Sequence, residues 1–224
     1  MIKRFAFTMA FATMILSAAA HTPDYDSLMR AAGMVDIKSV DSGIVVDLMY
    51  ASTHNFVGAD MYGTLRRAYL HPEAAEAVAA AQKALTIERP GLRLKICDAA
   101  RPMSVQKRMF DAVRGTSKAN YVSNPSRGGG LHNYGLAVDI IIVDSLGAEL
   151  PMGTCVDHLG PESNIDNEGL LIARGIITEQ QRANRLLLRR VMRSAGFRPL
   201  RTEWWHFNLR SRATARARYR LLNF

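Results

Sequence analysis

Hydrophobic and polar residues follow the pattern of strands in four segments of the chain. In 92–97 (LRLKIC) apolar side chains occupy every second position, the period of a strand with one buried face. The segments 43–50 (GIVVDLMY), 136–144 (LAVDIIIVD) and 200–210 (LRTEWWHFNLR) are rich in branched or aromatic apolar residues, which strands favour. We therefore predict four strands.

Three further segments carry helix signals. The segment 71–85 (HPEAAEAVAAAQKAL) has a proline in its first turn and a small-residue face suited to close packing. Ser104 is the predicted N-cap of a helix over 105–114, which Gly115 ends. Because strands and helices alternate irregularly, with hairpins, we predict an α+β fold: a single domain with a small, mainly antiparallel sheet flanked by helices.

The last helix is predicted from Thr178 to Ala195. Thr178 and Gln181 have the spacing of a capping box, in which each side chain bonds the other residue's backbone N–H. Ala183, Leu187 and Val191 fall on one face and are predicted to be buried. By contrast, residues 116–131 are polar and glycine-rich, which predicts a mobile loop leading to His132.

The first twenty residues have the composition of a secretory signal. A basic start, an apolar run and a small-residue end (SAAA) predict cleavage before His21 and a domain over 21–224. No later stretch approaches the apolar length of a membrane span, and no cysteine sits at the cleavage site to carry a lipid. We therefore expect an exported, periplasmic protein without a stable membrane anchor.

The formal net charge of the chain is +9. The excess is concentrated on the last predicted helix and in the tail, at Arg182, Arg185, Arg189, Arg190, Arg193 and between Arg210 and Arg220. Since no nucleic-acid-binding module or interleaved aromatic residues accompany these arginines, no nucleic-acid partner is expected, and a solvated helix face is favoured. Attraction to an anionic cell-wall polymer is the alternative.

His132, Asp139 and His206 are the candidate metal ligands. His132 and Asp139 stand in an H-x6-D arrangement where the glycine-rich loop enters a strand. Because a strand interior normally rejects a carboxylate, either Asp139 faces solvent or the two residues share a cation. A catalytic zinc needs three nitrogen or oxygen ligands and one open position, and His206 would complete that set. The alternative for each histidine is a structural, hydrogen-bonded role.

Glu203 is the candidate general base, three residues before His206 in EWWHF. Side chains alternate along a straight strand, so these two would point to opposite faces. A bulge, bend or strand end must intervene if both face one metal. The alternative for Glu203 is a surface carboxylate, and the two tryptophans between them are either site walls or core residues.

Arg101, Asp157 and the two cysteines are the other residues whose roles matter to the site. Arg101, in CDAARP, either projects into a cleft or pairs with Asp98. Asp157 follows PMGTCV and is, by sequence alone, an ordinary loop acid. Cys97 and Cys155 are the only cysteines; an oxidising compartment permits a bond between them, but the sequence does not decide whether they meet.

Taken together, these segments resemble the zinc-dependent D-alanyl-D-alanine dipeptidases of the vancomycin-resistance type, within the broader D-Ala-D-Ala peptidase group. The resemblance spans most of 21–224 and rests on several ordered motifs. They are DLMYASTHNFVGADMYG, CDAARP, HNYGLAVDI, PMGTCVD and RANRLLLRRVMRSAGFRPLRTEWWHF.

The resemblance implies a role for each candidate residue. One Zn²⁺ would be held by His132, Asp139 and His206 at one edge of the sheet. Glu203 would be the general base and later the proton donor, and Arg101 would stabilise the developing oxyanion. Asp157 would bind the free ammonium of a small dipeptide, with Tyr50 and Asn55 shaping the pocket. The expected reaction is hydrolysis of D-Ala-D-Ala in peptidoglycan turnover or salvage.

One departure from the family pattern concerns the grip on the substrate. The family usually carries serine two residues before the metal-binding histidine, and here that position is Gly130. Two alternatives stay open: a zinc D,D-carboxypeptidase or endopeptidase acting on peptidoglycan stem peptides, and a non-catalytic cell-wall binding protein. Asp157 distinguishes a dipeptidase from the first alternative, because it would close the pocket to longer peptides. Glu203 distinguishes an enzyme from the second alternative, because a binding protein needs no general base.

Overall fold

The computed structural model describes residues 23–224, so the predicted signal segment 1–20 lies outside the described residues. Its α-helices are α1 Tyr25–Ala31, α2 Ile37–Val40, α3 Pro72–Glu88, α4 Met103–Val113, α5 Glu168–Ala173, α6 Glu179–Ser194 and α7 Arg212–Arg218. Its strands are β1 Val35–Asp36, β2 Val45–Val46, β3 Tyr69–Leu70, β4 Arg93–Asp98, β5 Ala137–Val143, β6 Arg198–Leu200 and β7 Glu203–Asn208. Short 3-10 turns are η1 Met49–Ala51, η2 Ser117–Asn120, η3 Pro125–Arg127, η4 Leu131–Tyr134 and η5 Pro161–Ser163.

The main sheet has five strands in the order β2-β4-β5-β7-β6, and only the β2–β4 pair is parallel. A separate two-stranded antiparallel sheet pairs β1 with β3. β5 lies at the centre and every one of its residues is buried. Both faces of this strand are covered, which explains its nearly continuous apolar sequence. The predicted α+β fold with a mainly antiparallel sheet is confirmed.

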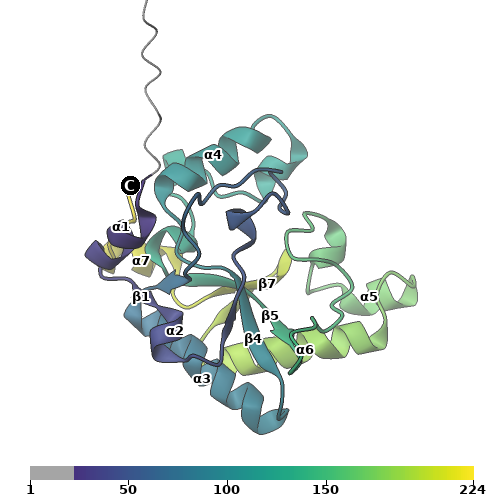
Figure 1. Cartoon of the computed structure of the whole chain (residues 1–224). Coiled ribbons are helices and arrows are strands. Elements are labelled where there is room, and N and C mark those ends of the chain that lie inside the picture. The colour runs from purple at the N-terminus through teal and green to yellow at the C-terminus, as the bar shows by residue number, and fades with distance from the viewer. Residues whose placement is uncertain (1–22) are drawn as a thin grey trace, which may run out of the picture.

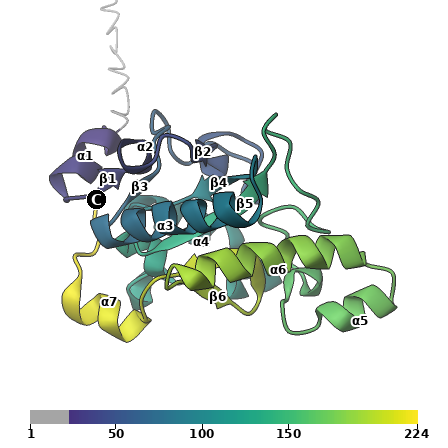
Figure 2. The same ribbon diagram turned by 90° about the horizontal axis from the view of Figure 1, so that it is seen from below.

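Helices α3 and α6 lie side by side across one face of the main sheet, and α4 lies on the other side (Figures 1 and 2). The alanine-rich face of α3 is buried, as the sequence predicted, and lets the helix backbone approach the sheet closely. The capping box of Thr178 and Gln181 is confirmed at the start of α6. In the described part of the chain, no helix has the length and apolarity needed to cross a membrane.

Two predicted element boundaries are wrong for tertiary reasons. The segment 43–50 forms only the two-residue strand β2, because the chain then turns through η1, where the Tyr50 carbonyl accepts bonds from the N–H groups of Met61 and Tyr62. Ser104 is not an N-cap, since α4 begins at Met103. The C-terminal tail satisfies the first turn instead, as the Ser104 N–H donates to the Phe224 carbonyl.

The basic face of α6 is only partly solvated. Arg185 and Arg189 are buried, and Arg189 makes a two-pronged ion pair with the buried Glu168 of α5. The helix is rotated slightly from the predicted face, so Ala183 is exposed while Leu187 and Val191 are buried. A local apolar period cannot reveal that a carboxylate from another helix neutralises an arginine on the inner face.

Candidate active site

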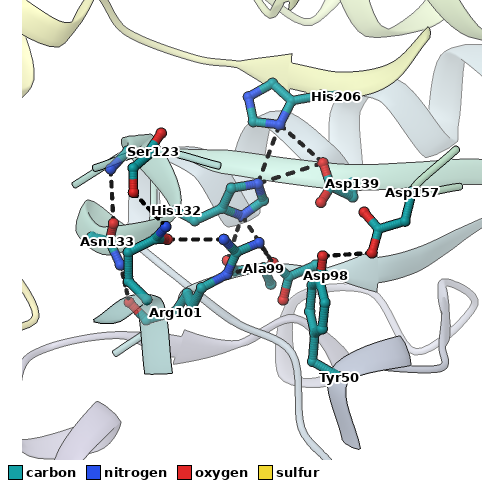
Figure 3. Close-up of polar contacts among 12 residues, drawn as sticks. Tyr50, Asp98, Ala99, Arg101, Ser123, His132, Asn133, Asp139, Asp157 and His206 are labelled. Atoms are coloured by element: carbon teal, nitrogen blue, oxygen red, sulfur yellow. Dashed lines mark hydrogen bonds and ion pairs between the residues drawn. The ribbon is translucent and has the colours of Figure 1, made fainter. Parts of the chain in front are cut away.

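Strand pairing brings two candidate ligands face to face. Asp139 on β5 is the direct cross-strand partner of His206 on β7, and the Asp139 Oδ1 to His206 Nδ1 distance is 2.9 Å. His132 Nε2 lies 3.2 Å from His206 Nδ1 and 3.4 Å from Asp139 Oδ1 (Figure 3). Asp139 is only 3 % exposed, which excludes the solvent-facing alternative. The three side chains converge on one point.

His132 reaches this point on η4, a short turn that ends at a glycine in an unusual backbone conformation. Gly135 ends the turn in the left-handed region, at φ 66°, and an added Cβ there would lie 2.7 Å from a backbone nitrogen. The Asn133 side chain accepts a bond from the Gly130 N–H and donates to the Arg101 carbonyl, which ties the turn to the segment after β4. The glycine and asparagine thus fix the direction in which the loop enters β5.

Each histidine is oriented by a hydrogen bond on the ring nitrogen that faces away from the cluster. His132 Nδ1 lies 2.7 Å from the Ala99 carbonyl, which can only accept, so this nitrogen carries the hydrogen and Nε2 keeps its lone pair. His206 Nε2 lies 2.9 Å from Asn208 Oδ1, which frees Nδ1 in the same way. Metal-ligating histidines characteristically have such outer partners.

The cluster fits a divalent cation. Ligand atoms about 2.0–2.1 Å from a tetrahedral ion lie about 3.3 Å from one another, close to the observed separations. Burial alone would raise the pKa of Asp139, but the two histidines outweigh it and hold that pKa well below the usual range. Burial alone would lower the pKa of His206, but Asp139 and Glu203 raise it to about 9. A bound cation would take the place of the proton that this electrostatic environment favours.

Glu203 lies next to the cluster, with Oε2 3.8 Å from His206 Nδ1. The irregularity that the sequence required is present, because the β6–β7 pairing shifts register between Pro199 and Leu200, opposite the start of β7. Both Glu203 and His206 therefore line one cavity. Burial, reinforced by the charge of Asp139, raises the pKa of Glu203 to about 7 although His206 opposes the shift. Trp204 and Trp205 are core residues and lie outside this cavity.

Arg101 both pairs with Asp98 and lines the cavity, the two positions that the sequence analysis gave as alternatives. Its Nε and Nη2 donate to the buried Asp98, its Nη1 donates to Gln106 Oε1 at 2.9 Å, and the guanidinium lies over the Tyr50 ring. Three of its five N–H groups are thereby used, and the side chain also lines the cavity. Arg101 is thus a rigidly held cation with donors left for a ligand.

Asp157 forms a second wall of the cavity. Tyr50 donates its hydroxyl to Asp157 Oδ2 at 2.6 Å (Figure 3). Burial and the charge of Asp139 raise the pKa of Asp157 to about 7, against the opposing effect of Tyr50. In the described chain, Asp157 is the only non-glycine residue with a positive φ, 63°. A half-buried acid with a strained backbone in a cavity is typical of a functional site.

Asn55 does not reach this cavity. Its side-chain amide donates to the carbonyls of Met49, Ser52 and Ala59, and its oxygen accepts the N–H groups of Val57 and Gly58. It therefore organises the loop from which Tyr50 projects. The other sequence-predicted residues, Tyr50, Arg101, His132, Asp139, Asp157, Glu203 and His206, all line one cavity of about 370 Å³.

The site lies at one end of three central strands, where β4 and β7 finish and β5 begins; the outer strands β2 and β6 supply no ligand to it.

A neighbouring cavity is lined by Cys97 and Cys155, both of which are free thiols, and shares Phe56 and Asp157 with the first. Phe56 and Asp157 therefore form the wall between the two cavities.

Two residues of the site, Gln106 and Asn208, were not assigned roles from the sequence, and Asp98 was named there only as the alternative partner of Arg101. Asp98 anchors Arg101 and lies 3.5 Å from His132 Nδ1, Gln106 holds the other side of Arg101, and Asn208 orients His206. Asn208 has a sequence signal, since it is two residues from His206 on the same face of a strand. Gln106 has none, because nothing in the sequence of a helix marks a buried amide.

Comparisons with known proteins identify the family of the chain. A family model described as D-ala-D-ala dipeptidase (Peptidase_M15) matches residues 30–221. The chain belongs to this peptidase family. The chain is also similar to the D-alanyl-D-alanine dipeptidase of Escherichia coli (strain K12), with 30% identity over 177 residues, which cover 79% of this chain and 84% of that protein. A D-alanyl-D-alanine dipeptidase of Synechocystis sp. is 34% identical over 87 residues, 34% of this chain and 33% of that protein. As a member of the D-Ala-D-Ala dipeptidase family, the chain is a peptidase.

Proposed function

We propose that this protein is a zinc-dependent D-Ala-D-Ala dipeptidase that releases two D-alanines in peptidoglycan turnover or salvage. The observation that carries the proposal is the convergence of His132 Nε2, Asp139 Oδ1 and His206 Nδ1 within 3.4 Å of one another, beside a buried Glu203 in a small cavity. Two nitrogens and one carboxylate oxygen are a donor set that zinc favours.

The metal and the base have separate tasks. Zinc held by His132, Asp139 and His206 would supply Lewis acidity toward the scissile carbonyl and lower the pKa of water. Glu203 takes the proton from the attacking water and later gives it to the nitrogen of the leaving D-alanine. A pKa near 7 suits a group that must both accept and return a proton at neutral pH.

Arg101 stabilises the negative charge that develops on the carbonyl oxygen. Its position is fixed before the substrate arrives by Asp98 and Gln106, so no reorganisation is needed during the reaction. Its remaining N–H groups are available to the oxyanion. Because the guanidinium is buried, its charge acts through a medium of low polarity and is weakly screened.

Asp157 binds the free ammonium of the dipeptide, assisted by the Tyr50 hydroxyl. A peptide extended at its amino end has no ammonium at this place and would have to pass the wall formed by Phe56 and Asp157. This wall favours a dipeptidase over an enzyme that acts on stem peptides. The residue at position 157 is therefore the main determinant of substrate length.

The test is release of free D-alanine by the purified protein, with D-Ala-D-Ala compared with a stem pentapeptide that ends in D-Ala-D-Ala. We expect cleavage of the dipeptide alone, abolished by a zinc chelator and restored by zinc. Glu203→Gln should retain stoichiometric zinc and lose activity by several orders of magnitude. Glu162→Gln, which changes a partly exposed carboxylate outside the cavity, should leave both zinc content and activity unchanged. Pentapeptide cleavage would identify a carboxypeptidase, and normal turnover by Glu203→Gln would exclude this mechanism.

We further propose that residues 1–20 direct export and that the protein works in the periplasm, with its basic surface able to associate weakly with the cell wall. The composition of the segment and the nature of the substrate support this location. Amino-terminal sequencing of the protein recovered from the periplasm should begin at His21. Retention of the full chain in the cytoplasm would contradict the proposal.

A further inference from the structure

Gly130 is a glycine whose backbone does not require one. Its φ of −109° and ψ of −176° are extended values that any residue adopts. An added Cβ, however, would lie 2.7 Å from Ser123 Oγ and 3.2 Å from Ser123 Cβ. The side chain of Ser123 therefore occupies the room into which a side chain at position 130 would extend, and both residues line the active-site cavity.

Ser123 is held in this place by the same buried network that positions Arg101. Gln106, which is fully buried, accepts a bond from Arg101 Nη1 and donates from Nε2 to the Ser123 carbonyl at 2.8 Å. Within residues 23–224 no hydrogen bond commits the Ser123 hydroxyl. Because Gln106 holds the Ser123 backbone and Ser123 lines the cavity, its hydroxyl is available to a ligand.

The position of Ser123 fits the far end of a dipeptide. Ser123 and Asp157 lie on opposite sides of the three ligand side chains (Figure 3). A dipeptide that places its ammonium at Asp157 must extend its carboxylate past the metal cluster, away from that acid. Arg198 and Arg212 line the same cavity, and among the described residues neither forms an ion pair, so the cavity also carries positive charge without a partner.

We propose that Ser123 donates its hydroxyl hydrogen to the terminal carboxylate of the dipeptide, and that Gly130 is required because it leaves room for this serine. The proposal rests on the proposed function, since it takes D-Ala-D-Ala as the ligand. The contact that a serine at residue 130 would make is thereby made by the serine at residue 123. The cavity has room for a serine side chain at one of these two positions but not at both.

The first experiment compares two substrates, D-Ala-D-Ala and its carboxyl-terminal amide, on the zinc-loaded protein. A hydrogen bond to a charged group is worth about a 10- to 100-fold change, so Ser123→Ala should lower kcat/KM for the dipeptide by that factor, mainly through KM. The same variant should hardly change kcat/KM for the amide, which lacks the charge. Ser126→Ala, an exposed serine of the same loop, is the matched control and should leave both substrates unaffected.

The second experiment exchanges the serine between the two positions. Gly130→Ser alone should lower kcat/KM because it collides with Ser123, and adding Ser123→Gly should restore activity to within a few-fold of the original protein. Equal losses on the dipeptide and the amide, or no rescue by the double variant, would overturn the assignment. Unchanged kcat/KM for the dipeptide in Ser123→Ala would also overturn it.

Binding separates this inference from the catalytic proposal. The Glu203→Gln protein, which should not turn over substrate, can be titrated calorimetrically with D-Ala-D-Ala. Adding Ser123→Ala to it should weaken binding by the same 10- to 100-fold factor. If dipeptide binds in this way but the original protein cleaves nothing, the hydrolytic function is wrong and the carboxylate contact stands; if the affinity is unchanged, the contact is wrong.

Discussion

Replacing Asp157 by asparagine should make the metal-free protein more stable while it impairs activity. The half-buried carboxyl accepts the Tyr50 hydroxyl hydrogen, and its partial removal from water together with the charge of Asp139 raises its pKa from an ordinary 3.8 to about 7 on folding. Each factor of ten in proton affinity corresponds to about 1.4 kcal/mol, so the ionised carboxylate costs on the order of 4 kcal/mol of folding free energy. Asparagine removes the charge and tolerates the positive φ of 63°.

The stabilisation should depend on pH with a definite sign. Below pH 3.8 the carboxyl is neutral in both the folded and the unfolded chain, so it imposes no penalty. As pH rises toward 7 the unfolded chain ionises freely and the folded one does not, and the wild-type protein loses stability that Asp157→Asn keeps. The advantage of the variant should therefore grow by about 2–3 kcal/mol between pH 5 and pH 8.

Denaturant unfolding in the presence of a zinc chelator measures this difference at the two pH values. Asp166→Asn, which removes an exposed carboxylate paired with Arg201, is the control, and its effect should stay within about 1 kcal/mol at both pH values. A stability difference for Asp157→Asn that is the same at pH 5 and pH 8 would refute the reasoning. The kcat/KM of Asp157→Asn for the dipeptide, measured with zinc, should fall at least about 10-fold, because the substrate ammonium loses a charged partner.

Three further perturbations test the framework around the site. Asn208→Ala should weaken zinc binding about 10-fold in a competition titration, because it removes the acceptor that orients His206, whereas unchanged affinity would show that Asn208 has no such role. Glu168→Gln should lower the free energy of unfolding by about 3–5 kcal/mol because it leaves Arg189 buried without its counter-charge, and a loss below about 1 kcal/mol in denaturant unfolding would contradict this. Gly135→Ala should lower the free energy of unfolding by about 3 kcal/mol in the same assay, because the residue has a left-handed backbone and its Cβ would collide with a backbone nitrogen. An unchanged free energy of unfolding would disprove the requirement for glycine.

The sequence alone determined the features that depend on neighbours along the chain. The strand over 136–144, the capping box at Thr178 and the alanine-rich face of α3 follow from local periods and caps, and all are present. The sequence also limited Asp139 to two alternatives, a solvent-facing position or a cation shared with His132, because a carboxylate inside an apolar strand requires a compensating partner. The burial of Asp139 then excluded the first. The need for an irregularity before His206 followed from the strand period alone.

Only the tertiary structure decided which distant groups meet. The β5–β7 register places Asp139 opposite His206, and no local pattern specifies that register. The Ala99 carbonyl that orients His132 and the Ser123 side chain beside Gly130 act through positions in space that their own sequence surroundings do not encode. A local pattern records which side chains prefer burial or a turn, whereas the identity of each buried partner is fixed only when the whole chain packs.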